Sequence, residues 1–230
     1  MSASMTSPKM EGDWGEAFRE HAMETSAGSG TAGVESKEDR GLVFVVRHGE
    51  TPWSRSGRHT GRTDVPLDEE GRLQAVRVGK MLAGCHFDRV LSSPLARALE
   101  TCKLAGFGET VQVDSDLMEW DYGEYEGRTT VSIRQQRPDW SLWRDGVPSG
   151  ETPAEVGTRA DRVIASLIAT GAMTLVFAHG HLLRVLAARW IGLSPQHGAR
   201  FALDAGALGV LGYERETPVI VRWNEAGKTP

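Results

Sequence analysis

The chain has 230 residues, 40% hydrophobic and 25% charged, which predicts one soluble globular domain rather than two. Its net charge of −5 argues against a nucleic-acid partner, which would usually require a basic excess. No apolar run is long enough to span a membrane, and no basic region precedes an apolar stretch at the N-terminus, so we expect neither a membrane partner nor a secretory signal. Cys85 and Cys102 form no CxxC pair, and two reduced thiols fit the cytoplasmic location that we expect.

Residues 1–40 differ in composition from the rest of the chain. They are rich in Ser, Gly, Thr, Glu and Met and show no sustained apolar periodicity. Such a segment buries too little apolar surface to offset the entropy lost on ordering. We therefore expect a disordered N-terminal extension over residues 1–40, with a docking arm as the alternative, and a folded domain over residues 41–230.

The first half of that domain predicts alternating strands and helices. Residues 42–46 are an apolar run rich in β-branched side chains, typical of a strand buried on both faces. Asp68 is the expected N-cap of a helix that continues to Gly84. Residues 89–92 predict a second buried strand, and Pro94 is expected to open the next helix.

The second half continues this alternation. Strands alternating with helices predict an α/β fold of three layers, α/β/α, in which the central layer is a largely parallel sheet. The elements expected here are an edge strand over 111–113, a helix over 154–169, a third buried strand over 174–178, a helix over 182–191, and a closing hairpin over 207–213 and 219–223.

Polar residues that suit a phosphate site follow the three buried strands. Arg47 and His48 follow the first strand, and Arg97 follows the second. His179 follows the third, and Glu119 lies in the polar stretch between the second and third strands. Ligands of open α/β sheets bind at the carboxyl ends of the strands, so we expect these side chains to converge.

Taken together, these residue types favour phosphoryl transfer. Arginine forks bind phosphate oxygens bidentately and stay charged, and phosphoryl transfer depends mainly on positioning and charge stabilisation. Each of these residues alone is more often an ordinary polar side chain. The prediction of a phosphate site depends on their occurrence together, in four separate segments that lead to one face of the sheet. His179 and His181 alone could indicate a metal site, but no third ligand completes a known metal motif, so we expect no metal and no cofactor.

The segment Arg47-His48-Gly49-Glu50-Thr51, placed after a buried strand, resembles the signature of the histidine phosphatase superfamily, which includes cofactor-dependent phosphoglycerate mutases. The resemblance covers residues 41–223 and implies a phosphoglycerate mutase-like fold, with a catalytic domain over residues 41–230. It continues through residues 57–67, Ser92-Ser93-Pro94 with Arg97, residues 119–127, residues 178–181 and Asp204-Ala205-Gly206.

This resemblance implies a role for each core position. His48 would be the nucleophile that forms a phosphohistidine, and Arg47 and Arg97 would clamp the phosphate. His179 would donate to the same oxygens, while Glu119 would protonate the leaving oxygen and then deprotonate the attacking water. We expect Arg97 to be a partly exposed clamp and Glu119 to lie in a partly dry, aromatic setting. The substrate-binding positions expected beside them are Ser54, Thr60, Gly61 and Arg62.

Both hydrolysis and mutase-type phosphotransfer can use this set of residues. The short stretch between Arg128 and Glu155 leaves little material for a lid, so we favour a metal-independent phosphatase of small phosphomonoesters, such as phosphosugars, phosphoglycerate-like or aryl phosphates. A phosphoglycerate mutase and a non-catalytic phospho-ligand binder are the alternatives. A homodimer paired through the C-terminal hairpin is a further expectation. The chain is similar to the branch of broad-specificity acid phosphatases and sedoheptulose bisphosphatases in residues 119–123, 143–146, 150–152 and 177–181.

The tryptophans leave two interpretations open. Trp53, Trp120, Trp140 and Trp143 lie in predicted loop or rim regions, where aromatic side chains could line a pocket for a sugar or aryl group. Packing within a flap is the other interpretation for Trp140 and Trp143.

Overall fold

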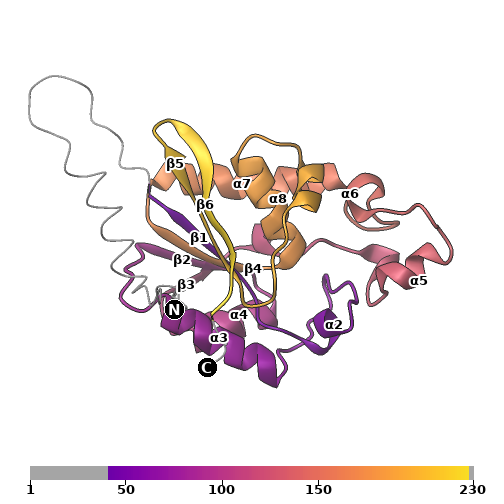
Figure 1. Ribbon diagram of the computed structural model, residues 1–230, viewed down its shortest axis with the longest axis horizontal. Coiled ribbons are helices and arrows are strands. Elements are labelled where there is room, and N and C mark those ends of the chain that lie inside the picture. Colours follow the sequence, from indigo (N-terminus) through magenta and orange to yellow (C-terminus); the bar gives the residue numbers. More distant parts are fainter. Residues whose placement is uncertain (1–40, 228–230) are drawn as a thin grey trace, which may run out of the picture.

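A computed structural model describes residues 41–227 as a six-stranded sheet between layers of helices (Figure 1). The strand order is β3-β2-β4-β1-β5-β6; the first four strands are parallel, and β5 and β6 join as an antiparallel hairpin. The predicted α/β fold with a largely parallel sheet is thus confirmed. The predicted extension over residues 1–40 lies outside the described residues. The strands are β1 (Val43–Arg47), β2 (Arg89–Ser92), β3 (Val111–Val113), β4 (Thr174–Ala178), β5 (Leu208–Glu214) and β6 (Thr217–Glu225).

The central strands are apolar along their length because both faces of the sheet are covered. Alternate residues of β1 enter different hydrophobic clusters: Val43 and Val45 pack into one, and Phe44 and Val46 into the other. This alternation follows from the two-residue period of a strand. Because β2, β4 and β1 are parallel neighbours, their carboxyl ends lie at the same end of the sheet.

One pair of long helices lies on each face of the sheet. The side chains of α3 (Glu69–Met81) and α4 (Ala96–Leu104) join the cluster that contains Phe44. Those of α7 (Pro153–Thr170) and α8 (Gly180–Trp190) join the opposite cluster. The shorter helices are α2 (Pro52–Arg55), α5 (Thr130–Arg134), α6 (Leu142–Asp145), η1 (Ser115–Leu117), η2 (Gly123–Tyr125) and η3 (Pro195–Arg200).

Helix starts follow capping chemistry that the sequence contains. Asp68 caps α3, as predicted, by accepting a 2.8 Å hydrogen bond from the backbone of Gly71. The helix expected from Pro94 begins instead at Ala96, because Leu95 keeps an extended backbone. Within the described part of the chain, no helix is long and apolar enough to cross a membrane.

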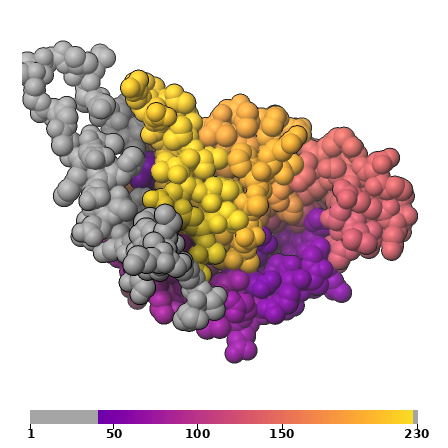
Figure 2. Space-filling model, in the orientation of Figure 1, coloured from indigo at the N-terminus to yellow at the C-terminus, as the bar shows by residue number. Residues whose placement is uncertain are grey.

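The segment with α5 and α6 forms a lobe at one end of the molecule, drawn in pink in the space-filling view (Figure 2). Trp140 and Leu142 of this segment are buried in the same cluster as α7 and α8. The segment is therefore a packed part of the domain and contributes core side chains near the strand ends.

Candidate active site

His48 lies directly beyond β1 and is fixed by the main chain on both sides. Its backbone N–H donates to the carbonyl of Ala178 at the end of β4, at 3.0 Å, and its own carbonyl accepts from Gly206 at 3.1 Å. The side chain is only 5% exposed. The imidazole is thus held at the carboxyl edge of the sheet, where the sequence places the site.

The imidazole of His48 is oriented through its neighbour Gly49. Its Nδ1 atom lies 2.6 Å from the Gly49 carbonyl oxygen, so Nδ1 carries the proton and Nε2 keeps its lone pair. Burial, together with the charges of Arg97 and Arg47, lowers the pKa of His48 well below that of free imidazole, against the Gly49 hydrogen bond, which raises it. His48 is therefore a neutral imidazole with its Nε2 lone pair free to attack.

Gly49 must be a glycine for a steric reason. A Cβ atom at this position would lie 2.2 Å from the carbonyl oxygen of Gly71, at the start of α3. The Gly49 N–H also donates to the hydroxyl of Thr101 on α4, at 3.0 Å. The carbonyl that orients His48 is thus fixed by two helices, and Thr101 is a site residue that sequence reasoning missed.

Arg97 enters the site from the first turn of α4 and is fully buried. Its guanidinium donates to three backbone carbonyls, those of Thr60, Gly61 and Thr63, at 2.9–3.1 Å. The expectation of a partly exposed clamp is therefore wrong: Arg97 also holds the loop over residues 60–63 in place.

Arg47 and His179 complete the cationic and donor side of the site. Arg47 donates to the Leu203 carbonyl, and the His179 ring lies 5.2 Å from the His48 ring, centroid to centroid. Within residues 41–227, three buried side-chain nitrogen atoms have no hydrogen-bond partner. These are Nε of Arg47, Nε of Arg97 and Nδ1 of His179, and all three belong to predicted phosphate-binding residues. Buried donors of this kind fit an anionic ligand, because leaving them unpaired is costly.

Glu119 follows η1 and reaches the N-terminus of α8. Its carboxylate accepts hydrogen bonds from the backbone N–H groups of Trp120 and Leu182, both at 2.9 Å, and of His181 at 3.0 Å. Glu119 is 5% exposed and Trp120 is fully buried, so the dry aromatic setting expected for this acid is confirmed. The bonds to the N-terminus of α8 thus fix the position of this carboxyl group.

A partly buried ion pair supports the loop that carries Glu119. Arg159 on α7 pairs with Glu151 at 2.6 Å and donates to the carbonyls of Asp116, Met118 and Glu119. Sequence reasoning missed Arg159, whose only signal is an arginine on the buried side of an otherwise apolar helix face.

The four predicted substrate-binding residues have other partners here. Thr51 is the N-cap of α2, and the Ser54 hydroxyl accepts from the Thr51 N–H and donates to the Thr51 carbonyl. Thr60 donates weakly to its own loop, and the Gly61 N–H donates to Glu126. The side chain of Arg62 contacts the sulfur of Met118 and pairs with Asp121 at 3.5 Å and with Glu151 at 4.0 Å.

Packing explains two of the tryptophans. Trp120 and Trp140 are buried in the core, whereas Trp53 and Trp143 are half-buried. Trp143 packs against both the Trp120 and the His181 rings, which also contact each other, and the Arg184 guanidinium lies over its ring at 4.5 Å from the centroid. Packing within the domain thus accounts for Trp120 and Trp140, whereas Trp53 and Trp143 are partly exposed.

The two histidines at the start of α8 do not share a ligand site. His181 is 2.7 Å from the Tyr122 hydroxyl, whereas His179 is bound to Ser93, so the two histidines have separate partners. No group of three or more His, Cys, Asp or Glu side chains in the described chain could hold a metal ion.

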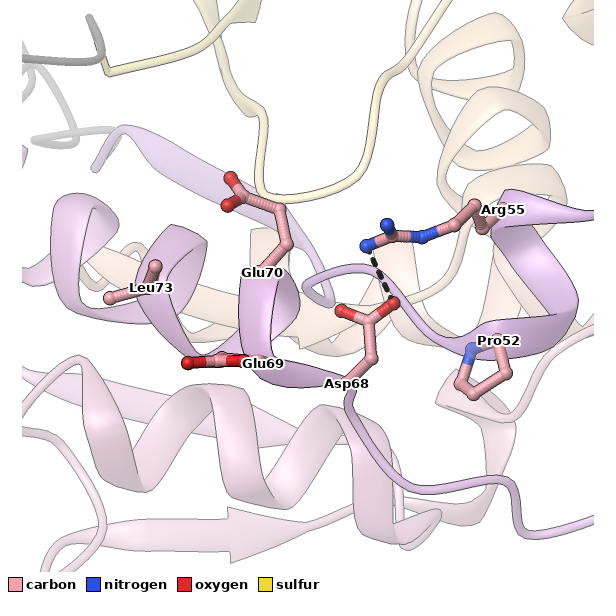
Figure 3. A pocket seen from close by; sticks show the side chains of 6 residues that line it. All are labelled: Pro52, Arg55, Asp68, Glu69, Glu70 and Leu73. Carbon is pink, nitrogen blue, oxygen red and sulfur yellow. Dashed lines mark hydrogen bonds and ion pairs between the residues drawn. The ribbon is translucent and has the colours of Figure 1, made fainter.

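A hollow of about 540 Å³ lies between α2 and α3, where Arg55 is paired with Asp68 (Figure 3). Three carboxylates line it, those of Asp68, Glu69 and Glu70, against the single guanidinium of Arg55, which disfavours a phosphate ligand.

A neutral imidazole under the influence of two guanidinium groups, that of Arg97 being fully buried, with a carboxyl group at a nearby helix terminus, is the arrangement of a phosphoryl-transfer enzyme on an α/β sheet. Comparison with known proteins gives the family. The histidine phosphatase superfamily (branch 1) matches residues 43–226, and the chain belongs to it. This match includes every core residue predicted from the sequence.

Two relatives of this chain are named as phosphatases. The acid phosphatase of Mycobacterium tuberculosis is 43% identical, over 75% of this chain and 86% of that protein. The sedoheptulose 1,7-bisphosphatase of Saccharomyces cerevisiae is 33% identical, over 74% and 86%. The solved structure of a Mycobacterium tuberculosis open reading frame superposes with a TM-score of 0.78 at 40% identity, over 82% of this chain and 99% of that one. This protein is therefore a histidine phosphatase.

Proposed function

We propose that this phosphatase hydrolyses small phosphomonoesters through a phosphohistidine on His48 and needs no metal. The observation that supports this most is the set of unpartnered donors on Arg47, Arg97 and His179 around a neutral imidazole. Two guanidinium groups and a neutral N–H offset the negative charge of a phosphate, which otherwise shields phosphorus from attack.

In the first step, Nε2 of His48 attacks phosphorus and the bond to the leaving oxygen breaks. Glu119 in its protonated form gives its proton to that oxygen, and the alcohol departs. The imidazole becomes cationic as the N–P bond forms, and its Nδ1–H remains bonded to the Gly49 carbonyl, which stabilises that charge. Splitting the reaction through a covalent intermediate replaces one difficult displacement with two easier ones.

In the second step, water attacks phosphorus opposite the imidazole. Glu119, now a carboxylate, accepts a proton from this water while the P–N bond breaks. Inorganic phosphate leaves, His48 is again neutral, and Glu119 is protonated for the next turnover. The three backbone donors to Glu119 keep its carboxylate in one position for both proton transfers.

The substrate class that we propose comprises phosphosugars, phosphoglycerate-like esters and aryl phosphates. The relatives named acid phosphatase and sedoheptulose 1,7-bisphosphatase support small phosphomonoesters. Hydrolysis is favoured over mutase-type transfer because the segment after Glu119 is short and packs Trp140 and Leu142 into the core. A phosphoglycerate panel with product analysis distinguishes the two reactions.

We further propose that the enzyme is cytoplasmic. The buried thiol of Cys102 suits a reducing compartment. We also propose a homodimer: β6 is an outer strand of the sheet, and an outer strand offers unpaired backbone groups to a second copy. Sedimentation analysis of the full chain tests this assembly, and a monomer at all concentrations contradicts it.

Trapping the intermediate tests the proposed mechanism. The enzyme is mixed with substrate, quenched in alkali, in which phosphohistidine survives, and digested for mass spectrometry. We expect a phosphoryl group on the peptide that contains His48, and its loss on acid treatment. An adduct on another residue, or turnover with no adduct at any quench time, contradicts the proposal.

A further inference from the structure

Ser93 and His179 form a buried pair within the site. Both are fully buried, and the Ser93 hydroxyl oxygen lies 2.7 Å from Nε2 of His179. Ser93 follows β2 and His179 follows β4, two neighbouring parallel strands. The Ser93 backbone N–H also donates to the Phe177 carbonyl at 2.9 Å, so the hydroxyl is fixed against the end of β4.

The hydrogen bonds of Ser93 decide which way this contact runs. Its oxygen already accepts from the backbone N–H of Leu95, at 3.3 Å. Among the described residues, Nε2 of His179 is the acceptor in reach of the single hydroxyl proton. If Nε2 carried a proton instead, the hydroxyl proton would be buried without an acceptor, which costs free energy. Ser93 is therefore the donor and Nε2 the acceptor.

The other ring nitrogen then carries the proton. Nδ1 of His179 is one of the three unpartnered buried atoms of the site, and its ring lies against that of His48. Burial, and then the charge of Arg97, hold the pKa of His179 well below that of free imidazole, so the ring is neutral and its tautomer matters. A neutral imidazole offers one N–H and one lone pair, and a lone pair at Nδ1 would repel a phosphoryl oxygen.

We propose that Ser93 is a positioning residue that fixes neutral His179 in its Nδ1–H tautomer, so that this N–H donates to the phosphoryl group transferred to His48. The proposal rests on the function proposed above and adds how the donor is prepared. Ser93 acts through His179 and does not itself touch the substrate.

The direct test is the tautomer of His179 in the unmodified protein. Long-range ¹⁵N–¹H NMR correlations distinguish protonated from unprotonated ring nitrogens, and a His179→Asn variant identifies the signals by their loss. We expect a protonated Nδ1 and an unprotonated Nε2. A protonated Nε2 in the wild-type enzyme overturns the proposal. This test does not depend on whether a Ser93 variant folds.

The second test removes the hydroxyl. Ser93→Ala is expected to shift His179 towards the Nε2–H tautomer. It is also expected to lower kcat/KM by about 10- to 100-fold and to weaken inhibition by inorganic phosphate. The matched control is Ser92→Ala, which removes an equally buried hydroxyl that bonds the Ser93 carbonyl and has no bond to His179. We expect Ser92→Ala to keep the wild-type tautomer.

Two outcomes overturn the proposal. One is a Ser93→Ala enzyme with the wild-type tautomer, and the other is a Ser92→Ala enzyme with the same tautomer shift as Ser93→Ala. Trapping the phosphohistidine separates this question from the mechanism itself. If the adduct forms on His48 and either of these results is found, only the positioning role of Ser93 is rejected. If no adduct forms, the proposed phosphatase mechanism itself is rejected.

Discussion

The Nδ1 atom of His48 lies 2.6 Å from the carbonyl oxygen of Gly49, the next residue in the chain. This contact fixes the ring rotation and the tautomer together, because a carbonyl only accepts hydrogen bonds. The contact depends on Gly49 lying against the backbone of Gly71 and on its N–H bond to Thr101. The local backbone at the end of β1 thus prepares the nucleophile before any substrate is bound.

The lowered pKa of His48 predicts activity in acid. The neutral ring is the reactive form, and a group whose folded pKa is below 6.5 stays neutral as the pH falls through 6.5. We expect the loss of kcat/KM that arises from His48 to begin well below pH 6.5. A pH profile corrected for ionisation of the substrate measures it. A loss of activity centred on pH 6.5, as for free imidazole, contradicts the prediction.

Arg97 is predicted to support both folding and turnover. Arg97→Ala removes a buried guanidinium from three carbonyls, so we expect a loss of about 3 kcal/mol in the free energy of unfolding. We also expect a fall in kcat of about 10²-fold or more. Urea unfolding and steady-state kinetics measure the two effects.

The control for Arg97 is Arg72→Ala on the neighbouring helix. Arg72 is half exposed and pairs with Glu100 at 2.7 Å, and surface pairs of this kind contribute at most about 1 kcal/mol. Wild-type stability and activity in Arg97→Ala would contradict this prediction. They would show that the loop over residues 60–63 keeps its conformation, and that phosphate binds, without this arginine.

The role proposed for Glu119 predicts a dependence on the leaving group. A general acid contributes about 10²- to 10⁴-fold when the leaving oxygen is basic, and less when it is stable as an anion. We expect Glu119→Gln to reduce hydrolysis of an alkyl phosphate much more than that of p-nitrophenyl phosphate. Equal losses on both substrates would exclude Glu119 as the acid. Because the Gln amide places an NH₂ group opposite backbone N–H donors, unfolding is measured in parallel.

Arg159 is predicted to act on catalysis through the loop that carries Glu119. Arg159→Ala should reproduce the leaving-group dependence of Glu119→Gln in weaker form, because the carbonyls of Met118 and Glu119 lose their donor. Arg162→Ala is the matched control: Arg162 lies on the same helix and pairs with Asp116, but its side chain is 55% exposed. Kinetics with the two substrates measure the difference. Identical behaviour of the two arginine variants would show that the buried contacts do not position Glu119.

The sequence predicts most of the fold because its strands are short apolar runs and its helices carry recognisable caps, as at Asp68. It also places the core site residues, since the strand ends bring Arg47, His48 and His179 to one edge. The burial of Arg97 was not predictable in this way, because it depends on carbonyls of a loop more than 30 residues away.

Long-range side-chain partners account for the other differences. Ser93 reaches His179 across 86 positions, and Arg159 reaches Glu119 across 40. Neither contact leaves a periodic signal in the sequence. The family match adds the class of enzyme, whereas the contacts that orient each group come from the packed structure alone.

The most direct measurement is hydrolysis of p-nitrophenyl phosphate in excess EDTA by the wild-type enzyme and by His48→Ala, with Ser92→Ala as a folded control. We predict turnover by the wild-type enzyme without added metal and none above background by His48→Ala. Because His48 lies at the strand end and outside both hydrophobic clusters, the His48→Ala protein should stay folded. Activity that survives in His48→Ala, or that EDTA abolishes in the wild-type enzyme, contradicts metal-free catalysis by this histidine.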